Sequence, residues 1–285
     1  MHSIPLGQYC LLMNPDQGLS YLDIQHPDFS AQLYLQGAHL TQFRPSKQQP
    51  WLWLSDDSPL QANKAIRGGI PICWPWFGRT QPGFPAHGIA RISEWHLDSY
   101  HEQSDSVQIE LHLNYSPKTN SDWPYPCRAQ LRFQLSKELR IELISENTGN
   151  MPMPLSLAMH SYFACQQLDN LIIFGLENCT SVEQGQRLSP SGHCQSINPG
   201  MDRVYFEHSG QLRVEGLANG RLELQSTAMP SVVLWNPGPQ TAATMKDLSG
   251  DGSDFFCAEN GLIMDDEIML SPGEQHQCQV VMRFV

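Results

Sequence analysis

The sequence predicts an all-β protein, a large antiparallel β-sandwich. Two observations carry this prediction. Apolar and polar residues alternate over many short segments, and 21 glycines and 21 prolines separate these segments. No stretch of helical length keeps a 3.6-residue period. Large all-β domains commonly reach about 200–250 residues as one unit, so we expect a single domain over residues 1–285 of the 285-residue chain.

Strand candidates follow one another along the chain. Segment 107–115 alternates apolar and polar residues without a break, which is typical of a strand with one buried face. Segments 131–135 and 139–143 repeat the pattern, and the gap between them suits a hairpin. Asn219-Gly220 predicts a two-residue hairpin turn, because both residues tolerate positive φ. The other candidates are 31–35, 39–43, 171–176, 211–217, 221–227, 231–235 and 277–284.

Two polar stretches, 45–63 and 184–202, contain proline or glycine and interrupt the strands. Neither is of low complexity or a run of like charge, and strand candidates occur on both sides of each. We therefore interpret them as long loops within one domain. Loops of this length in a compact domain are usually functional or else mobile.

Composition excludes several classes of protein. The chain has 17 Lys+Arg against 29 Asp+Glu, a net charge of −12, which argues against nucleic acid as a partner. No segment approaches the ~20 apolar residues that cross a bilayer, and no signal-peptide pattern opens the chain. The eight cysteines form no CxxC pair and predict buried thiols. We expect a cytoplasmic monomer with a small-molecule substrate, no nucleic acid and no membrane contact.

The first segment with candidate chemistry is 67–78, RGGIPICWPWFG, followed by PAHGIAR at 85–91. Its glycines, prolines and aromatic residues predict a rigid turn with aromatic walls. Such a wall beside arginines can hold a sugar ring, although Trp74 can equally be core. Arg67 and Arg91 either clamp a phosphate group or form surface salt bridges.

Two further residues interrupt apolar, strand-like runs. His160 lies in the run 157–163, where a histidine is more often a satisfied core group than a catalyst. Glu259 follows the run 255–258 and is either a turn residue or a buried acid/base with a shifted pKa. The chain has no phosphate-loop, GxSxG or HExxH motif. We therefore expect no metal and no cofactor.

Together these segments resemble the aldose 1-epimerase superfamily, also called galactose mutarotase-like, and within it the hexose-6-phosphate 1-epimerase branch. The resemblance spans most of the chain, and RGGIP with HG.AR is typical of that branch. The motifs are RGGIPICWPWFG at 67–78, PAHGIAR at 85–91, LAMHSYF at 157–163, MDRVY at 201–205, VVLWNPG at 232–238, CAENG at 257–261 and LSPGE at 270–274.

The resemblance implies a galactose mutarotase-type β-sandwich and a pair of catalytic groups. His160 matches the general acid of the family and Glu259 its general base. Arg67 and Arg91 match substrate-binding arginines that favour a phosphorylated sugar. Such an enzyme interconverts the α and β anomers of a hexose 6-phosphate without a cofactor.

Asp202 matches a carboxylate that holds sugar hydroxyls, the alternative being a loop-end aspartate paired with Arg203. His87 is a further candidate sugar contact. Two rival functions remain open on the same fold. One is an aldose 1-epimerase that acts on unphosphorylated sugars, and the other is a carbohydrate-binding module without activity.

Overall fold

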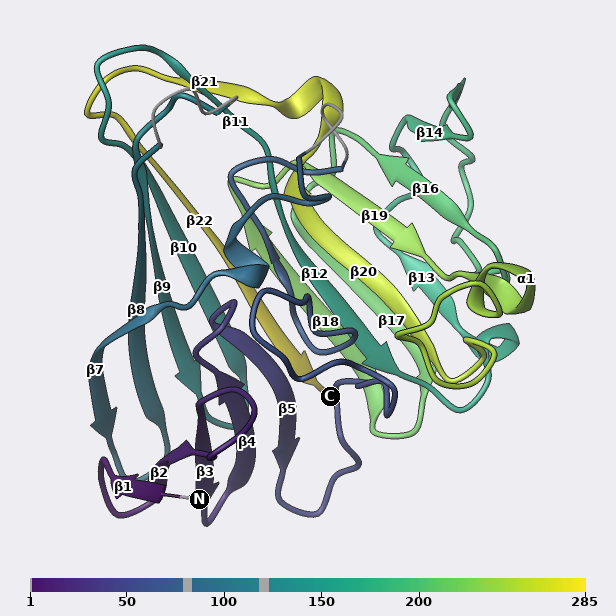
Figure 1. The fold of residues 1–285 in the computed structure, drawn as a ribbon. Coiled ribbons are helices and arrows are strands. Elements are labelled where there is room, and N and C mark those ends of the chain that lie inside the picture. Colours follow the sequence, from purple (N-terminus) through teal and green to yellow (C-terminus); the bar gives the residue numbers. More distant parts are fainter. Residues whose placement is uncertain (1, 79–83, 118–122) are drawn as a thin grey trace.

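The computed structural model describes residues 2–78, 84–117 and 123–285. Four sheets make up almost all of the regular structure, and their strands pair antiparallel throughout the described part of the chain (Figure 1). The predicted fold class, an antiparallel all-β sandwich, is confirmed.

The eight-stranded sheet contains most of the strands that alternation predicted. Along β8, β9 and β10, buried residues alternate with residues that water reaches. Its strands, in spatial order, are β13 (Ile172–Phe174), β17 (Gln211–Leu217), β18 (Gly220–Thr227), β22 (Gln275–Phe284), β10 (Leu139–Asn147), β9 (Cys127–Leu135), β8 (Val107–Tyr115) and β7 (His96–Glu102).

The seven-stranded sheet is different, because its central strands are buried on both faces. All eight residues of β20 are buried, and so are seven of the eight in β12. Its strands, in spatial order, are β15 (Gln186–Leu188), β14 (Ser181–Glu183), β16 (Asp202–Tyr205), β19 (Ser231–Trp235), β20 (Phe255–Leu262), β12 (Leu157–Ala164) and β6 (Ile72–Cys73).

The remaining elements are smaller. A five-stranded meander contains β1 (His2–Pro5), β2 (Cys10–Asn14), β3 (Tyr21–His26), β4 (Phe29–Tyr34) and β5 (His39–Pro45), and β11 (Met153–Leu155) pairs with β21 (Ile268–Leu270). The helical elements are α1 (Gly238–Ala242) and the 3-10 turns η1 (Ala90–Ile92), η2 (Leu168–Asn170) and η3 (Met264–Asp266). None of the helices in the described residues is long and apolar enough to cross a membrane.

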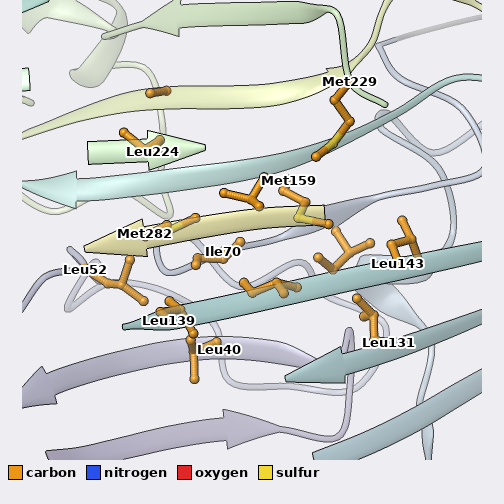
Figure 2. Close-up of a cluster of buried hydrophobic side chains, with 14 of the residues drawn as sticks. Leu40, Leu52, Ile70, Leu131, Leu139, Leu143, Met159, Leu224, Met229 and Met282 are labelled. Atoms are coloured by element: carbon orange, nitrogen blue, oxygen red, sulfur yellow. The ribbon is translucent and has the colours of Figure 1, made fainter. Parts of the chain in front are cut away.

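One apolar core lies between the two large sheets. Leu143 of β10, Met282 of β22 and Met159 of β12 all belong to this cluster, and Leu40 extends it to β5 (Figure 2). Because side chains alternate along a strand, Met159 and Phe163 face this core while His160 and Tyr162 face away from it. Burial of each such leucine or methionine contributes about 1.5–3 kcal/mol. The core thus fixes which face of β12 is left for other chemistry.

Two local predictions need correction. The predicted turn at Asn219-Gly220 lies one residue earlier, because Leu217 pairs directly with Gly220 and the turn residues are 218 and 219. An extra residue after Val214 shifts the register of β17 by one. The predicted loop 184–202 contains the short strand β15, which pairs with β14.

Candidate active site

His160 and Glu259 face each other across two neighbouring strands. His160 of β12 is the direct register partner of Glu259 of β20. The His160 Nε2 and Glu259 Oε1 atoms lie 3.2 Å apart, and only 9% and 3% of the two side chains is exposed. Residues 99 positions apart in the sequence therefore form a buried acid/base pair.

The same face of the sheet continues around this pair. Tyr162 stands opposite Cys257, two residues along each strand from His160 and Glu259. The Tyr162 ring stacks on the His160 imidazole, with centroids 4.7 Å apart and planes 5° apart. Trp235 of β19 meets His160 edge-on at 6.1 Å. Aromatic rings therefore fix the plane of the imidazole.

Burial shifts the pKa of both members of the pair toward the neutral form. Desolvation raises the pKa of Glu259 well above its usual range, and the charge of Asp202 raises it further, against the opposing effect of Arg91. Desolvation lowers the pKa of His160 well below its usual range, helped by the positive charges of His87, Arg67 and Arg91. Both shifts favour the neutral carboxyl and the neutral imidazole, so burial disfavours a charge on either member of the free pair.

The pair also has hydrogen-bonding capacity left over. Within the described residues, neither His160 Nδ1 nor Glu259 Oε2 has a hydrogen-bond partner, and both atoms are buried. A buried polar atom without a partner costs roughly 1–3 kcal/mol. Two such atoms side by side are a reason to look for a bound molecule.

Arg67 supports the aromatic stack. Its Nε and Nη2 groups donate to Asp247 Oδ2 at 3.1 and 2.9 Å, and its Nη1 donates to the Tyr162 hydroxyl at 3.0 Å. Asp247 therefore neutralises much of the Arg67 charge, and Arg67 in turn holds Tyr162 against His160. The sequence left open whether Arg67 clamps a phosphate or forms a salt bridge. In the structure Arg67 forms a salt bridge with Asp247, at the wall of the site.

Arg91 lies in η1, and its hydrogen-bond partner differs in kind from that of Arg67. Its Nη2 donates to the Ala86 carbonyl at 2.7 Å. Among the residues that the structure describes, no carboxylate lies within ion-pair distance of it. Its charge nevertheless lowers the pKa of both His160 and Glu259. Unlike Arg67, which is paired with Asp247, Arg91 has a charge that could bind an anionic group.

His87 joins the cluster from the loop after the first motif. Its ring lies 6.0 Å from that of His160 and 4.7 Å from that of Phe77, edge-on to both. The next residue explains the placement. Gly88 has φ +78°, and a Cβ there would lie 2.0 Å from the Trp74 carbonyl oxygen, so only glycine allows this close approach.

Asp202 lies at the rim, where β16 begins. Its side chain is exposed on one side, and both partial burial and the charge of Glu183 raise its pKa. The alternative of a pair with Arg203 is wrong, since Arg203 donates to Glu183 Oε2 at 2.6 Å. The negative charge of Asp202 contributes to the raised pKa of Glu259. The Asp202 carboxylate therefore lies near the pair, at the edge of the site.

Trp74 is not brought to this cluster. Its indole is fully buried in the core between the large sheets, and Nε1 donates to the Ser145 hydroxyl of β10 at 3.0 Å. A ring in that position fills the core and does not face a sugar. The structure therefore corrects the expectation that Trp74 stacks on the substrate.

Sequence reasoning missed four residues of the site: Tyr162, Cys257, Trp235 and Asp247. The first two could have been found, because residues two apart on a strand share a face with His160 and Glu259. Trp235 lies inside the quoted segment 232–238. Asp247 stands in a loop 180 positions from its partner Arg67, and no local pattern indicates it.

Comparison with known proteins agrees with this geometry. The family model described as aldose 1-epimerase matches residues 21–283. A protein of Escherichia coli K12, provisionally named a glucose-6-phosphate 1-epimerase, is 31% identical over 268 residues, which cover 92% of this chain and 90% of that protein. This chain belongs to the aldose 1-epimerase family. A Salmonella typhimurium protein with the same provisional name is 33% identical over 246 residues, 85% of this chain and 82% of that protein.

Solved structures of the aldose 1-epimerase family and its neighbours share the fold. A provisionally named mutarotase from Salmonella typhimurium superposes with a TM-score of 0.90 at 28% identity, over 99% of this chain and 96% of that one. A galactose 1-epimerase from Lactobacillus acidophilus reaches a TM-score of 0.75 at 15% identity, over 98% of both chains. The second likeness shows the fold alone.

Proposed function

We propose that this member of the aldose 1-epimerase family is a hexose-6-phosphate 1-epimerase, acting on glucose 6-phosphate or a related aldohexose 6-phosphate. The observation that carries the proposal is the buried His160–Glu259 pair beside the cation Arg91, with two polar atoms that have no hydrogen-bond partner in the described part of the chain. The names of the two bacterial relatives support the same substrate class.

In the proposed reaction the pair moves protons between two oxygens of the sugar. With the proton of the pair on His160, the Glu259 carboxylate takes the proton from the C1 hydroxyl while His160 gives its proton to the ring oxygen. The bond between C1 and the ring oxygen opens to the free aldehyde, which rotates about C1–C2 and closes on its other face. Closure reverses both transfers, so the pair regains its starting protonation. Each positioned acid or base contributes roughly 10²–10⁴-fold.

In the same proposal the surrounding residues divide the work of binding. Arg91 holds the phosphate, because a guanidinium with no carboxylate partner among the described residues can form a bidentate contact to phosphate oxygens. Arg67 contributes less charge, since Asp247 already accepts two of its hydrogen bonds. Asp202 at the rim and His87 hold sugar hydroxyls.

The test measures anomer exchange by NMR. Exchange between α- and β-glucose 6-phosphate is followed with and without the protein, alongside free glucose and free galactose. We expect acceleration of the phosphosugar above all. Acceleration of free sugars alone would instead identify a general aldose 1-epimerase. Binding of sugar without acceleration of any would identify a carbohydrate-binding module.

A variant then connects the preference to Arg91. Loss of a charge-assisted hydrogen bond costs about 1.5–3 kcal/mol, so we expect Arg91→Gln to raise KM for glucose 6-phosphate by about 10–100-fold. Turnover of any free sugar should change little. Arg140→Gln is the matched control, because Arg140 lies on the exposed face of β10 and bonds only to Gln279 among the described residues. Equal KM values in both variants would overturn the assignment of the phosphate to Arg91.

A further inference from the structure

Three side chains of metal-ligating type meet at the floor of the site. One ligand atom each from His160, Cys257 and Glu259 lies within 4.8 Å of the other two, and all three residues are buried. They come from the paired strands β12 and β20, on the face away from the main core. The proposed epimerase reaction uses His160 and Glu259 but gives the Cys257 thiol no role.

A second observation points to a ligand at the same place. Glu259 Oε2 and His160 Nδ1 are buried and have no hydrogen-bond partner among the described residues. The side chains that carry them are 97% and 91% buried, given exposed fractions of 3% and 9%. Sugar hydroxyls would satisfy these atoms by hydrogen bonds, and a cation held between the two side chains would satisfy the Glu259 oxygen by coordination.

The donor set selects the class of cation. An imidazole nitrogen, a thiolate sulfur and a carboxylate oxygen together suit zinc and other thiophilic divalent ions, while magnesium and calcium prefer oxygen ligands alone. Ligand atoms of a tetrahedral zinc site lie about 3.5 Å apart. Side-chain rotation that shortens the separations between the ligand atoms by about 1 Å closes the set, and a fourth ligand would come from outside these three residues.

The charges around the set partly compensate each other. The negative charge of Asp202 and the positive charge of Arg91 both act on Glu259, with opposite sign. Arg67 is already paired with Asp247. A cation bound by a thiolate and a carboxylate is therefore neutralised by its own ligands.

We propose that His160, Cys257 and Glu259 bind a thiophilic divalent cation, Zn²⁺ or Cd²⁺, and that the bound cation switches off the epimerase by occupying its acid and its base. The thiol proton passes to solvent as sulfur binds the metal. The effect on activity rests on the proposed function. Binding of the metal does not, so the two are measured separately.

Binding is measured with Cd²⁺, whose bond to a thiolate absorbs in the ultraviolet. All proteins carry Cys194→Ser, because Cys194 is the exposed cysteine. Cys257→Ser and Cys257→Ala are compared with Cys73→Ser, a matched control that removes another fully buried thiol close to the site but outside the triad. We expect one equivalent of Cd²⁺ to give the absorption band in the parent and the control. Neither Cys257 variant should give it.

Inhibition is measured with Zn²⁺ in the anomer exchange assay on the same proteins. We expect Zn²⁺ to inhibit the parent and Cys73→Ser, and removal of Cys257 to raise the inhibitory concentration by about 100-fold. Equal inhibition in all variants, or a Cd²⁺ band that survives in Cys257→Ala, would overturn the site. If no sugar were turned over, the Cd²⁺ band alone would still decide whether the triad binds metal.

Discussion

The two large sheets use the same antiparallel ladder in opposite ways. In the eight-stranded sheet, Leu131 and Phe133 face the core while Arg132 between them lies on the exposed face, near Glu110 and Glu142. In the seven-stranded sheet, β20 has no exposed residue at all. One sheet is wet on one face, and the central strands of the other are enclosed on both.

This difference decides where chemistry can occur. An ion pair on a wet face, such as Arg132 with Glu142, contributes about 0–1 kcal/mol, because water screens it. On the enclosed face, desolvation moves the pKa values of His160 and Glu259 far from their usual ranges. In this chain the His160–Glu259 pair therefore lies where the sheet has lost its solvent.

The largest effect should come from Glu259→Gln. The amide keeps the volume of the side chain but accepts no proton, so we expect anomer exchange of glucose 6-phosphate to fall by about 10²–10⁴-fold. Sugar binding should remain, and so should the melting temperature, because the substitution removes a buried ionisable group. NMR exchange spectroscopy and a phosphosugar binding titration measure the two quantities.

The matched control for this variant is Glu142→Gln, which makes the same change on the wet face of β10. Its activity should equal that of the parent protein. Equal activity of Glu259→Gln and the parent would remove Glu259 from the reaction and leave a protein that only binds sugars.

Alternation predicted the wet sheet closely and the enclosed one poorly. The segments 107–115 and 211–217 coincide with β8 and β17 of the eight-stranded sheet. In the seven-stranded sheet, 231–235 coincides with β19, but β15 falls in the predicted loop 184–202. Regular alternation arises where one face of a strand is polar. Because β12 and β20 are buried at nearly every position, their sequences gave no indication of which face would be used. The two strands that carry the candidate site were recognised as strand-like runs, but the sequence did not show which of their side chains face the site.

For the candidate site, the sequence indicated several of the residues, and the structure showed which side chains contact them. His160 and Glu259 stood out as polar residues in apolar runs, and the family motifs brought them together before any geometry was known. The partner of Arg67 could not be predicted, because Asp247 lies in a distant loop. The sequence could not show whether Trp74 belongs to the core or to the site. The strand before it has only two residues, too few for an alternating pattern that would assign Trp74 to one face.

Acid sensitivity should next separate a buried histidine of the meander, in β5, from an exposed histidine of the eight-stranded sheet, in β7. His39 is fully buried, and its Nε2 donates to the Gly68 carbonyl at 2.7 Å. Burial lowers its pKa to about 4, against the opposing effect of that hydrogen bond. Below its ordinary pKa of about 6.5 the unfolded chain binds a proton that the folded protein refuses. The free energy of unfolding should therefore fall as pH drops from 6.5 toward 4, by on the order of 3 kcal/mol.

This loss is checked by urea unfolding at pH 7, 5.5 and 4.5. His39→Gln can still donate to Gly68 but does not titrate, so its stability should depend less on pH. His101→Gln on the exposed strand β7 is the control and should follow the parent. Parallel profiles for the parent and His39→Gln would assign the acid sensitivity to other groups.

The smallest effect compares two tryptophans on opposite faces of the enclosed sheet. Trp74 faces the core and bonds to Ser145, whereas Trp235 meets His160 edge-on. Trp74→Phe should lower the free energy of unfolding by about 1–3 kcal/mol, through lost volume and a lost hydrogen bond, with anomer exchange unchanged. Trp235→Phe should slow anomer exchange, and it should lower the free energy of unfolding less than Trp74→Phe does. If Trp74→Phe slowed exchange at unchanged stability, Trp74 would contact the sugar, and the division between core face and site face would fail.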